Sequence, residues 1–261
     1  MTNPHGTPIW YELQTTDAAA SKAFYDSVLG WTIAATSGQP GMDYRMIQTA
    51  DGGLVGGVMP LSEGMIAGGT RPTWLFYIGV DDVDAAARLI AEQGGSVTMG
   101  PFDIPGAGRA ALVADPQGVP FYLMRGSSDA ASTAWDPTAM GRCNWNELAT
   151  PDHAVGNAFY AGVFGWTYPD SMPMGAMGDY VFVEAAGQTI GATMRQGVDQ
   201  RLGWQFYFGA PDIDVAVEAV NAGGGTVHAG PMEVPGGRRI IVASDPHGVA
   251  FGIVGPGTGG K

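Results

Sequence analysis

The sequence predicts an α+β fold made of four βαβββ modules, and two internal repeats carry this prediction. The stretch WYELQTTDAAASKAFYDSVLGW (residues 10–31) returns 135 positions later as WNELATPDHAVGNAFYAGVFGW (residues 145–166). A second motif, Trp74-Leu-Phe-Tyr, returns 130 positions later as Trp204-Gln-Phe-Tyr. Because each motif reads as a strand that leads into a helix, the chain contains four such units in two similar halves.

The length of the chain suits two compact domains better than one. It has 261 residues, of which 45% are hydrophobic, so each half can bury a core of its own. We place the first domain at residues 1–127, a Ser/Ala/Asp-rich linker at 128–139 and the second domain at 140–261.

Charge and composition exclude several classes of partner. The net charge of −13 disfavours nucleic acid and anionic membranes, because both attract basic surfaces. With one cysteine, Cys143, the chain cannot form an internal disulfide or a cysteine zinc cluster. The sequence shows no long apolar run and no signal-type N-terminus, which predicts a cytoplasmic protein without a membrane partner.

The first module follows from its residue pattern. A strand is predicted at residues 9–15, and Asp17 is placed to cap a helix that Gly30 ends. Residues 1–7 are expected to form a loose tail. The helix is predicted at 18–29, further strands at about 32–36, 44–49 and 54–59, and a glycine-rich candidate lid loop at 60–72.

The second module restarts this pattern, and the second half of the chain repeats both. A strand at residues 74–80 precedes a helix that runs to Gln93, with Asp81 or Asp82 as its N-cap. The turn Asp115-Pro-Gln-Gly precedes the last strand. The remaining strands of this module are predicted at about 96–99, 109–114 and 120–124.

These modules resemble the vicinal oxygen chelate superfamily. The shared features are x-x-L-x-x-x-D at the first strand, A-F-Y in the helix, G-W after it and D-P-x-G before the last strand. That superfamily includes glyoxalase I, bleomycin-binding resistance proteins, fosfomycin-modifying enzymes and extradiol dioxygenases, and the chain is most similar to tandem actinobacterial members. The resemblance implies two glyoxalase-like domains, each a curved mixed sheet around a cavity with helices outside.

The resemblance also implies where a metal would bind. In metal-dependent members, His, Gln or Glu ligands stand seven residues before the Asp that caps the first helix and seven residues after the Asp of D-P-x-G. In this chain the matching positions are Trp10, Trp74, Trp145 and Trp204 at the first strands, and Tyr122 and Gly252 at the last strands. Because the indole of tryptophan has no lone pair to offer a metal, we predict a metal-independent protein without a cofactor.

Strand alternation selects the candidate site residues. If Leu13 faces the helix, its neighbours on both sides face the cavity. Aromatic walls with a few polar groups are typical of small-molecule pockets, and a carboxylate desolvated by indoles is a candidate general base. The candidate catalytic residues are Glu12 and Glu147, and the candidate ligand-binding residues are Trp10, Gln14, Trp74, Phe76, Tyr122, Trp145, Trp204 and Phe206.

Structural roles for the same residues stay open. The tryptophans can fill the interior as core residues. Glu12 and Glu147 can each pair with an arginine, for which Arg109 and Arg239 are the candidates, and such pairing would lower the pKa of the carboxylate. Tyr77 has the parity of the helix-facing side chains and is predicted to be core.

Three functions are compatible with these features. The first is a bleomycin resistance-like protein that binds a planar, aromatic or apolar small molecule without a metal. The second is a metal-independent isomerase, lyase or cyclase that uses Glu12 or Glu147 as its base. The third, a metal-dependent glyoxalase or dioxygenase, is disfavoured by the tryptophans. Whether the protein is an enzyme stays open, and we expect a monomer or a homodimer.

Overall fold

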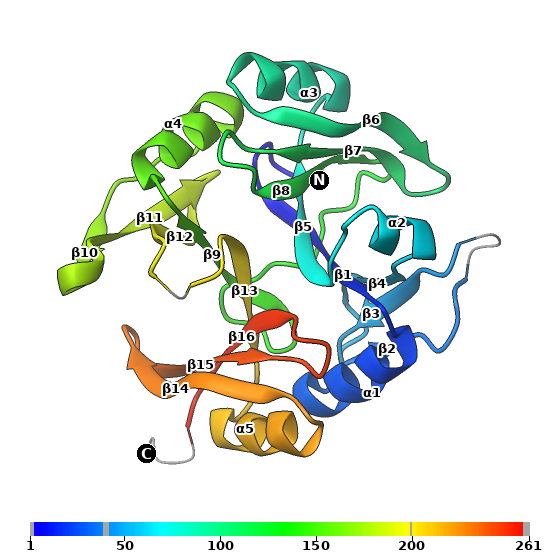
Figure 1. The fold of residues 1–261 in the computed structure, drawn as a ribbon, viewed down its shortest axis with the longest axis vertical. Helices are drawn as coiled ribbons and strands as arrows, with labels where there is room; N and C mark the ends of the chain where they lie inside the picture. The colour runs from blue at the N-terminus through cyan, green and yellow to red at the C-terminus, as the bar shows by residue number, and fades with distance from the viewer. Residues whose placement is uncertain (1–2, 39–41, 199, 258–261) are drawn as a thin grey trace. The chain divides into compact units, whose positions relative to one another are not determined.

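The computed structural model describes residues 3–38, 42–198 and 200–257 of the chain. Strands and helices follow one another in the order that the repeats predict (Figure 1). The first half contains β1 (Pro8–Thr15), α1 (Ala18–Leu29), β2 (Thr32–Ile33), β3 (Arg45–Gln48), β4 (Leu54–Pro60), α2 (Glu63–Ala67), β5 (Thr73–Gly79), α3 (Val83–Glu92), β6 (Ser96–Ile104), β7 (Gly108–Ala114) and β8 (Pro120–Gly126). The second half contains β9 (Cys143–Thr150), α4 (His153–Phe164), β10 (Ser171–Pro173), the short 3-10 turn η1 (Gly175–Met177), β11 (Asp179–Ala185), β12 (Gln188–Arg195), β13 (Gly203–Gly209), α5 (Ile213–Ala222), β14 (Thr226–Val234), β15 (Arg238–Ser244) and β16 (Ala250–Gly255).

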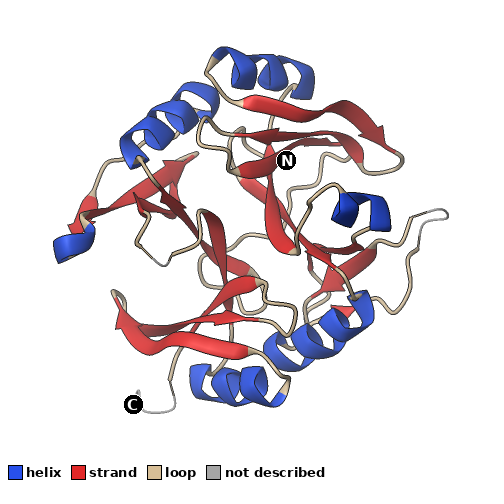
Figure 2. Cartoon of the chain, viewed as in Figure 1, coloured by secondary structure: helices blue, strands red, loops and turns tan. Residues whose placement is uncertain are grey.

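Each half of the chain forms one eight-stranded mixed sheet. The strand orders are β2-β3-β4-β1-β5-β8-β7-β6 and β10-β11-β12-β9-β13-β16-β15-β14, so the second sheet repeats the first. In both, the first strand pairs in parallel with the last strand of its own module, β4 or β12. Helix α3 lies along β6 and β7, and α5 lies along β14 and β15 (Figure 2). The predicted α+β fold of four βαβββ modules is confirmed.

The contacts divide the chain into two compact units that interleave along the sequence. In unit 1, α3 packs beside α4, and Phe121 lies 5.9 Å from Phe164 between ring centroids. In unit 2, α1 packs beside α5, and Phe24 lies 5.9 Å from Phe251 (Figure 1). Each unit therefore takes its core from both halves of the sequence. Unit 1 comprises residues 1–10, 75–132 and 145–205, and unit 2 comprises residues 11–74, 133–144 and 206–261.

Helices α1, α3, α4 and α5 all begin at an aspartate, as the sequence predicts. Asp17 accepts hydrogen bonds from the first backbone N–H groups of α1, at 2.9 Å. For α3 the cap is Asp82 and not Asp81. Gly30 and Gly165 end α1 and α4 in the left-handed conformation, with φ of +65° and +69°, which glycine adopts without steric cost.

The N-terminal residues from Asn3 onward are not a loose tail. The Gly6 N–H donates to the Gly79 carbonyl at 2.8 Å, and the Trp166 indole N–H donates to the Gly6 carbonyl at 2.7 Å. A Cβ atom on Gly6 would lie 2.9 Å from the Phe164 carbonyl oxygen. The prediction of a loose tail was wrong because these bonds join segments far apart in sequence, which leave no periodic signal in the tail itself.

The predicted linker and the predicted lid are both ordered. The Ser132 hydroxyl donates to the Ile9 carbonyl at 2.5 Å. Asp136 accepts the backbone N–H groups of Thr138 and Ala139, both at 2.8 Å. The loop at 60–72 contains the short helix α2. The domain boundaries and the lid role stay predictions.

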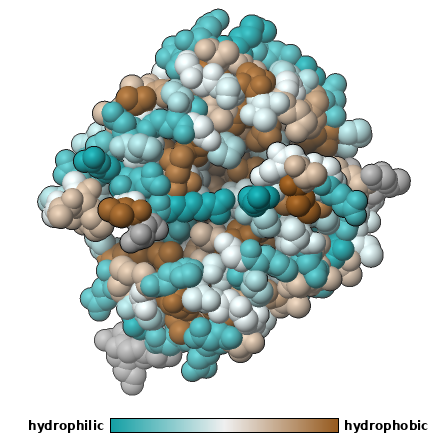
Figure 3. Space-filling view, in the orientation of Figure 1, coloured by the Kyte–Doolittle hydropathy of each residue, from teal (hydrophilic) through white to brown (hydrophobic). Residues whose placement is uncertain are grey.

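Polar side chains predominate on the face shown in Figure 3, and apolar side chains are scattered among them. None of the helices in the described part of the chain has both the length and the apolar character that a bilayer span requires.

Candidate functional site

Three side chains of the second half form a hydrogen-bonded run on β9 and β11. The Trp145 indole N–H donates to the Tyr180 hydroxyl at 2.7 Å, and that hydroxyl donates to Glu147 Oε2 at 2.7 Å. The Phe182 ring lies edge-on to Trp145 and to Tyr180, with ring centroids 6.1 and 5.9 Å away. All four side chains are half-buried. We call Trp145, Glu147, Tyr180 and Phe182 the Glu147 cluster; it lies entirely within unit 1.

Strand alternation places this cluster on the face of the sheet that points away from α4. Leu148 is fully buried toward α4, since a Cβ atom on Gly156 of that helix would lie 4.0 Å from its Cδ2. The adjacent Glu147 therefore points to the opposite face. Strand β12 lies between β9 and β11, and its Ala192 pairs with Glu147 in the β9–β12 ladder. A small methyl group thus lies beside the carboxylate.

The matching carboxylate of the first half, Glu12, is enclosed. Its exposed fraction is 2%, and the Gln14 side-chain amide donates to Glu12 Oε1 at 3.0 Å. Tyr44, which repeats Tyr180, lies against Gly57, the residue that pairs with Glu12. A Cβ atom on Gly57 would lie 2.2 Å from the Tyr44 ring. The structure therefore brings the predicted residues Glu12 and Gln14 together.

Two predicted ligand-binding residues, Trp10 and Tyr122, meet in an apolar cluster of unit 1. The Tyr122 ring stacks on Tyr77 with centroids 4.3 Å apart and planes 9° from parallel. Ile9, Leu75 and Ala110 complete the buried part, and the half-buried Trp10 packs against it. Tyr77 therefore does not have the helix-facing orientation that was predicted; it shares a face with Trp10 and Tyr122.

Of the other four aromatic candidates, Trp74, Phe76 and Phe206 lie in the cores of their units, and Trp204 is half-buried. Trp74 is 3% exposed and its indole N–H donates to the Tyr25 hydroxyl of α1 at 3.1 Å. Trp204 makes the same bond to the Tyr160 hydroxyl of α4, also at 3.1 Å. The expected cavity-facing orientation of Trp74 and Trp204 is therefore wrong, because each indole bonds a tyrosine of a helix. Their role in ligand binding stays a prediction. Phe76 and Phe206 are fully buried as well.

The error in orientation comes from matching the tryptophans of the four modules with one another. The caps of α3 and α5 are Asp82 and Asp212. Seven residues before them stand Leu75 and Gln205, whereas the prediction used the tryptophans one position earlier. A shift of one residue turns every side chain of a strand to the opposite face. Aligning the four capping aspartates, instead of the four tryptophans, would have found the correct face.

Behind these tryptophans, each unit has a buried tyrosine–aspartate hydrogen bond. The Tyr25 hydroxyl donates to Asp245 Oδ2 at 3.3 Å, and the Tyr160 hydroxyl donates to Asp115 Oδ2 at 3.2 Å. Burial raises the pKa of both carboxyl groups, against the opposing effect of backbone N–H bonds within the D-P-x-G turns. Burial likewise raises the pKa of both tyrosines well above its ordinary value. These bonds tie a turn of one half to a helix of the other, which is a structural role.

The arginines proposed as partners of the two glutamates bind other carboxylates. Arg109 contacts Asp84 at 2.6 Å and Asp103 at 2.9 Å, and Arg239 contacts Asp214 at 3.0 Å. The hydrogen bonds from Arg109 hold the pKa of Asp84 below its ordinary value. Pairing of Glu12 or Glu147 with these two arginines was therefore a wrong alternative.

The residues at the ligand positions implied by the resemblance do not fit a divalent cation. With the corrected register, these positions hold Trp10, Leu75, Trp145 and Gln205 at the first strands. The last-strand positions hold Tyr122 and Gly252. Only Gln205 and Tyr122 offer a side-chain oxygen, and one amide and one phenol do not make a site that needs three or more protein ligands. In residues 3–38, 42–198 and 200–257, no group of three His, Cys, Asp or Glu side chains is arranged to hold a metal.

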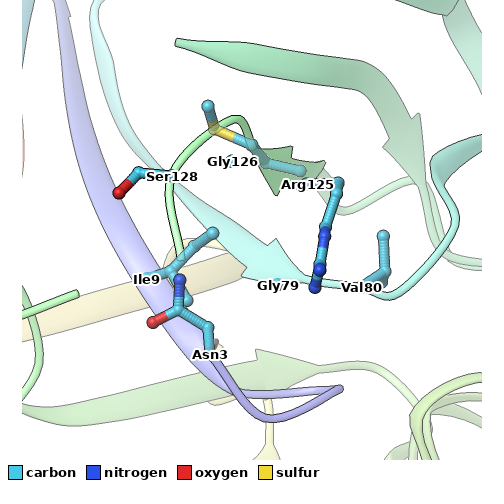
Figure 4. Close-up of a pocket in the computed structure, with 8 residues that line it drawn as sticks. Asn3, Ile9, Gly79, Val80, Arg125, Gly126 and Ser128 are labelled. Carbon is cyan, nitrogen blue, oxygen red and sulfur yellow. The ribbon is translucent and has the colours of Figure 1, made fainter. Parts of the chain in front are cut away.

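A small cavity lies where the ends of β5 and β8 meet the N-terminal segment (Figure 4). Its volume of about 10 Å³ has room for about one water molecule and not for an organic ligand. None of the predicted site residues lines it. The lining residues are Asn3, Ile9, Gly79, Val80, Met124, Arg125, Gly126 and Ser128.

Known proteins of similar sequence cover almost the whole chain. CFP32 of Mycobacterium tuberculosis, which carries a provisional glyoxylase name, is 35% identical over 254 residues, 96% of this chain and 95% of that protein. The anthracycline biosynthesis protein DnrV of Streptomyces peucetius is 33% identical over 263 residues, 95% of this chain and 93% of that protein.

Solved structures share the fold at lower identity. The Mn(II)-bound glyoxalase from Novosphingobium aromaticivorans superposes with a TM-score of 0.67 and 19% identity over 96% of this chain and 82% of that chain. An extradiol ring-cleaving dioxygenase from B. fuscum gives a TM-score of 0.68 and 17% identity over 97% of this chain and 72% of that chain. A family model described as "Glyoxalase/Bleomycin resistance protein/Dioxygenase superfamily" matches residues 8–123 and 142–253. The chain therefore belongs to the glyoxalase/bleomycin resistance protein/dioxygenase superfamily.

Proposed function

We propose that this protein binds a planar or apolar aromatic small molecule, without a metal, on the sheet face that carries the Glu147 cluster. The observation that supports this most directly is the half-buried run in which Trp145 bonds Tyr180 and Tyr180 bonds Glu147, each at 2.7 Å. Rings that hydrogen bonds already hold in place lose little conformational freedom when a ligand binds. Aromatic faces offer stacking area, and the carboxylate accepts a strong hydrogen bond from a ligand hydroxyl.

The names of two relatives support an aromatic ligand of this class. DnrV and the DauV protein of Streptomyces sp. strain C5, which is 31% identical, are both described as anthracycline biosynthesis proteins. An anthracycline is a planar system of fused rings that bears phenolic hydroxyl groups. Such a molecule matches an edge-on pair of aromatic rings beside a hydrogen-bond acceptor.

The side chains at the implied metal-ligand positions support binding without a metal. The positions where metal-dependent members of the superfamily hold ligands carry two indoles, an aliphatic side chain, one amide, one phenol and a glycine here. Indole and aliphatic groups have no lone pair for a cation.

A fluorescence titration tests this proposal. Metal-stripped protein is titrated with 1,4-dihydroxyanthraquinone, and quenching of tryptophan emission is followed with and without added Mn²⁺. We expect saturable quenching with a dissociation constant of roughly 1–100 μM, unchanged by the metal. Tyr180→Phe removes the hydroxyl that links Trp145 to Glu147, and we expect it to weaken binding about tenfold.

Tyr168→Phe is the matched control variant. The Tyr168 hydroxyl is buried and has no hydrogen-bond partner among the described residues, so its loss leaves the Glu147 cluster intact. Quenching that does not saturate argues against the proposal, and so does binding that appears only with Mn²⁺. Equal weakening in the two tyrosine variants contradicts the assignment of the site to the Glu147 cluster.

A second candidate function is a metal-independent isomerase, lyase or cyclase with Glu147 as general base. The half-exposed carboxylate at 2.7 Å from a tyrosine hydroxyl favours it, because such a pair can move a proton to or from a bound substrate. The two functions separate with Glu147→Gln. If this variant binds a substrate but does not convert it, the protein is an enzyme.

A further inference from the structure

We propose that the hairpin between β10 and β11 binds one soft monovalent cation, Cu(I) or its chemical analogue Ag(I), through three methionine sulfurs. The hairpin carries the run Ser-Met-Pro-Met-Gly-Ala-Met, whose methionines are Met172, Met174 and Met177. Thioether sulfur is a soft ligand, and soft ligands select Cu(I), whereas oxygen ligands suit Mn²⁺. This site goes beyond the proposed function, because it uses none of the four side chains of the Glu147 cluster.

Strand β10, at the edge of its sheet (Figure 1), aligns two of the sulfurs. Met172 lies within β10, and Met174 directly follows that strand. Residues two apart in a strand point to the same face and lie about 7 Å apart. Each methionine side chain has three rotatable bonds, so two of them span that distance and bring both sulfurs to one ion.

A 3-10 turn brings the third methionine to the same side. The Met177 N–H donates to the Met174 carbonyl at 3.3 Å, and the Met174 N–H donates to the Gly178 carbonyl at 2.8 Å. These two bonds close the tip of the hairpin. Side chains three residues apart in a 3-10 turn lie one above the other, so Met177 lies over Met174. Met174 is therefore aligned with Met172 along the strand and with Met177 around the turn.

Exposure and charge favour access of a cation to this hairpin. Met177 is 49% exposed, and the other two methionines are half-buried. Asp170 and Asp179 flank the run, and residues 143–194 contain no lysine or arginine. A surface of one charge sign raises the local concentration of ions of the opposite sign.

The first half of the chain serves as an internal comparison. The matching stretch before β3, residues 34–44, contains one methionine, Met42. A single thioether cannot supply the three sulfurs that the second half offers. We therefore expect one site per chain, in the second half.

A titration of the full chain with Ag(I), followed by NMR of ¹³C-methyl-labelled methionines, tests the proposal. Ag(I) is the probe because it is as soft as Cu(I) and air does not oxidise it. We expect three of the 13 methionine resonances to shift together and to saturate at one Ag(I) per chain. The dissociation constant should be on the order of 1–10 μM.

The test variant carries Met172→Leu, Met174→Leu and Met177→Leu. Leucine keeps the volume of methionine and lacks the sulfur, so the hairpin should fold and the affinity should fall at least about tenfold. If Ag(I) binds this variant as it binds the wild type, or if no methionine resonance of the wild type shifts, the proposal is wrong.

The matched control variant carries Met42→Leu, Met99→Leu and Met232→Leu. These methionines are 43%, 45% and 43% exposed and lie on three separate segments, so the control should bind Ag(I) as the wild type does. Both variants keep the buried Cys143, so its thiol cannot account for a difference between them. Equal losses in the two variants would reveal adventitious binding to surface thioethers and overturn the proposal.

The pH dependence of binding identifies the ligands. Thiol and imidazole ligands lose a metal as they become protonated, whereas a thioether carries no proton. We expect the affinity for Ag(I) to change less than about twofold between about pH 5 and 7.5. A tenfold or greater weakening at the lower pH would indicate cysteine or histidine ligands and contradict the assignment to the three methionines.

Discussion

Tyr160 uses one hydroxyl group for two buried hydrogen bonds. It accepts from the Trp204 indole at 3.1 Å and donates to Asp115 at 3.2 Å. Without the hydroxyl, a buried N–H and a buried carboxylate oxygen lose their common partner. A polar group left unpaired in the interior costs more than the lost hydrogen bond itself contributes.

Tyr160→Phe is therefore expected to lower the free energy of unfolding by about 1–3 kcal/mol in a urea titration. The control is Tyr168→Phe, whose hydroxyl is buried but has no partner in the described residues. It should change stability by less than about 0.5 kcal/mol or raise it slightly. If both variants lose the same amount, the hydroxyl of Tyr160 does not hold the Trp204–Asp115 pair.

Asp115 should make stability depend on pH. Burial raises the pKa of its carboxyl group in the folded protein above the unfolded value. Folding then favours the protonated form of Asp115. The contribution of this pKa shift to the free energy of unfolding is complete below the unfolded pKa and is lost as the pH rises through the folded pKa. Asp115→Asn has no such titration.

As the pH is raised from about 3 to 7, we expect the free energy of unfolding of the wild type to fall relative to that of Asp115→Asn. Urea titrations at several pH values measure it. If the difference stays constant, or if the wild type gains stability relative to the variant, the turn N–H bonds to Asp115 affect its pKa at least as strongly as burial does.

At the scale of single elements, α3 uses only one of two adjacent aspartates as its N-cap. Asp82 accepts the Ala85 N–H at 2.9 Å, whereas Asp81 is exposed and lies 3.7 Å from His5 and 3.8 Å from Arg125. The two adjacent aspartates look alike in the sequence, and only one of them closes the first turn of the helix.

Asp82→Ala should cost about 1 kcal/mol of stability, the usual contribution of an N-cap. Asp81→Ala removes only exposed ion pairs and should cost less than about 0.5 kcal/mol. Thermal unfolding of the two variants side by side measures the difference. A larger loss for Asp81→Ala than for Asp82→Ala would contradict the assignment of Asp82 as the N-cap of α3.

At the scale of the whole molecule, each compact unit combines segments from both sequence halves. Phe24 of α1 packs against Phe251, and a Cβ atom on Gly225 would lie 2.9 Å from the Phe24 ring. The first predicted domain, residues 1–127, contains Phe24 but neither of its partners. Cutting the chain between the halves therefore exposes an apolar helix face.

We expect residues 1–127, expressed alone, to self-associate, because a second copy can cover that face where the other half does in the intact chain. Size-exclusion chromatography with light scattering measures the mass, with the full chain as the control. A monomeric fragment that unfolds cooperatively would contradict this expectation and support two independent domains with the predicted boundaries.

The sequence by itself determined the four modules, the aspartate caps, the glycine helix ends and the place of both glutamates on β1 and β9. These features are encoded by neighbouring residues, so a repeat or a local pattern reveals them. Tyr180 was visible only as a repeated tyrosine, and nothing local connects it to a glutamate 33 residues earlier.

Only the tertiary structure decided which side chains meet. It placed Trp74 and Trp204 against tyrosines of α1 and α4, stacked Tyr77 on Tyr122, and bonded Gln14 to Glu12 but Tyr180 to Glu147. Each of these contacts depends on the pairing and register of strands distant in sequence. A change of one residue in register exchanges the two faces of a strand, and no local pattern records which register the packed core selects.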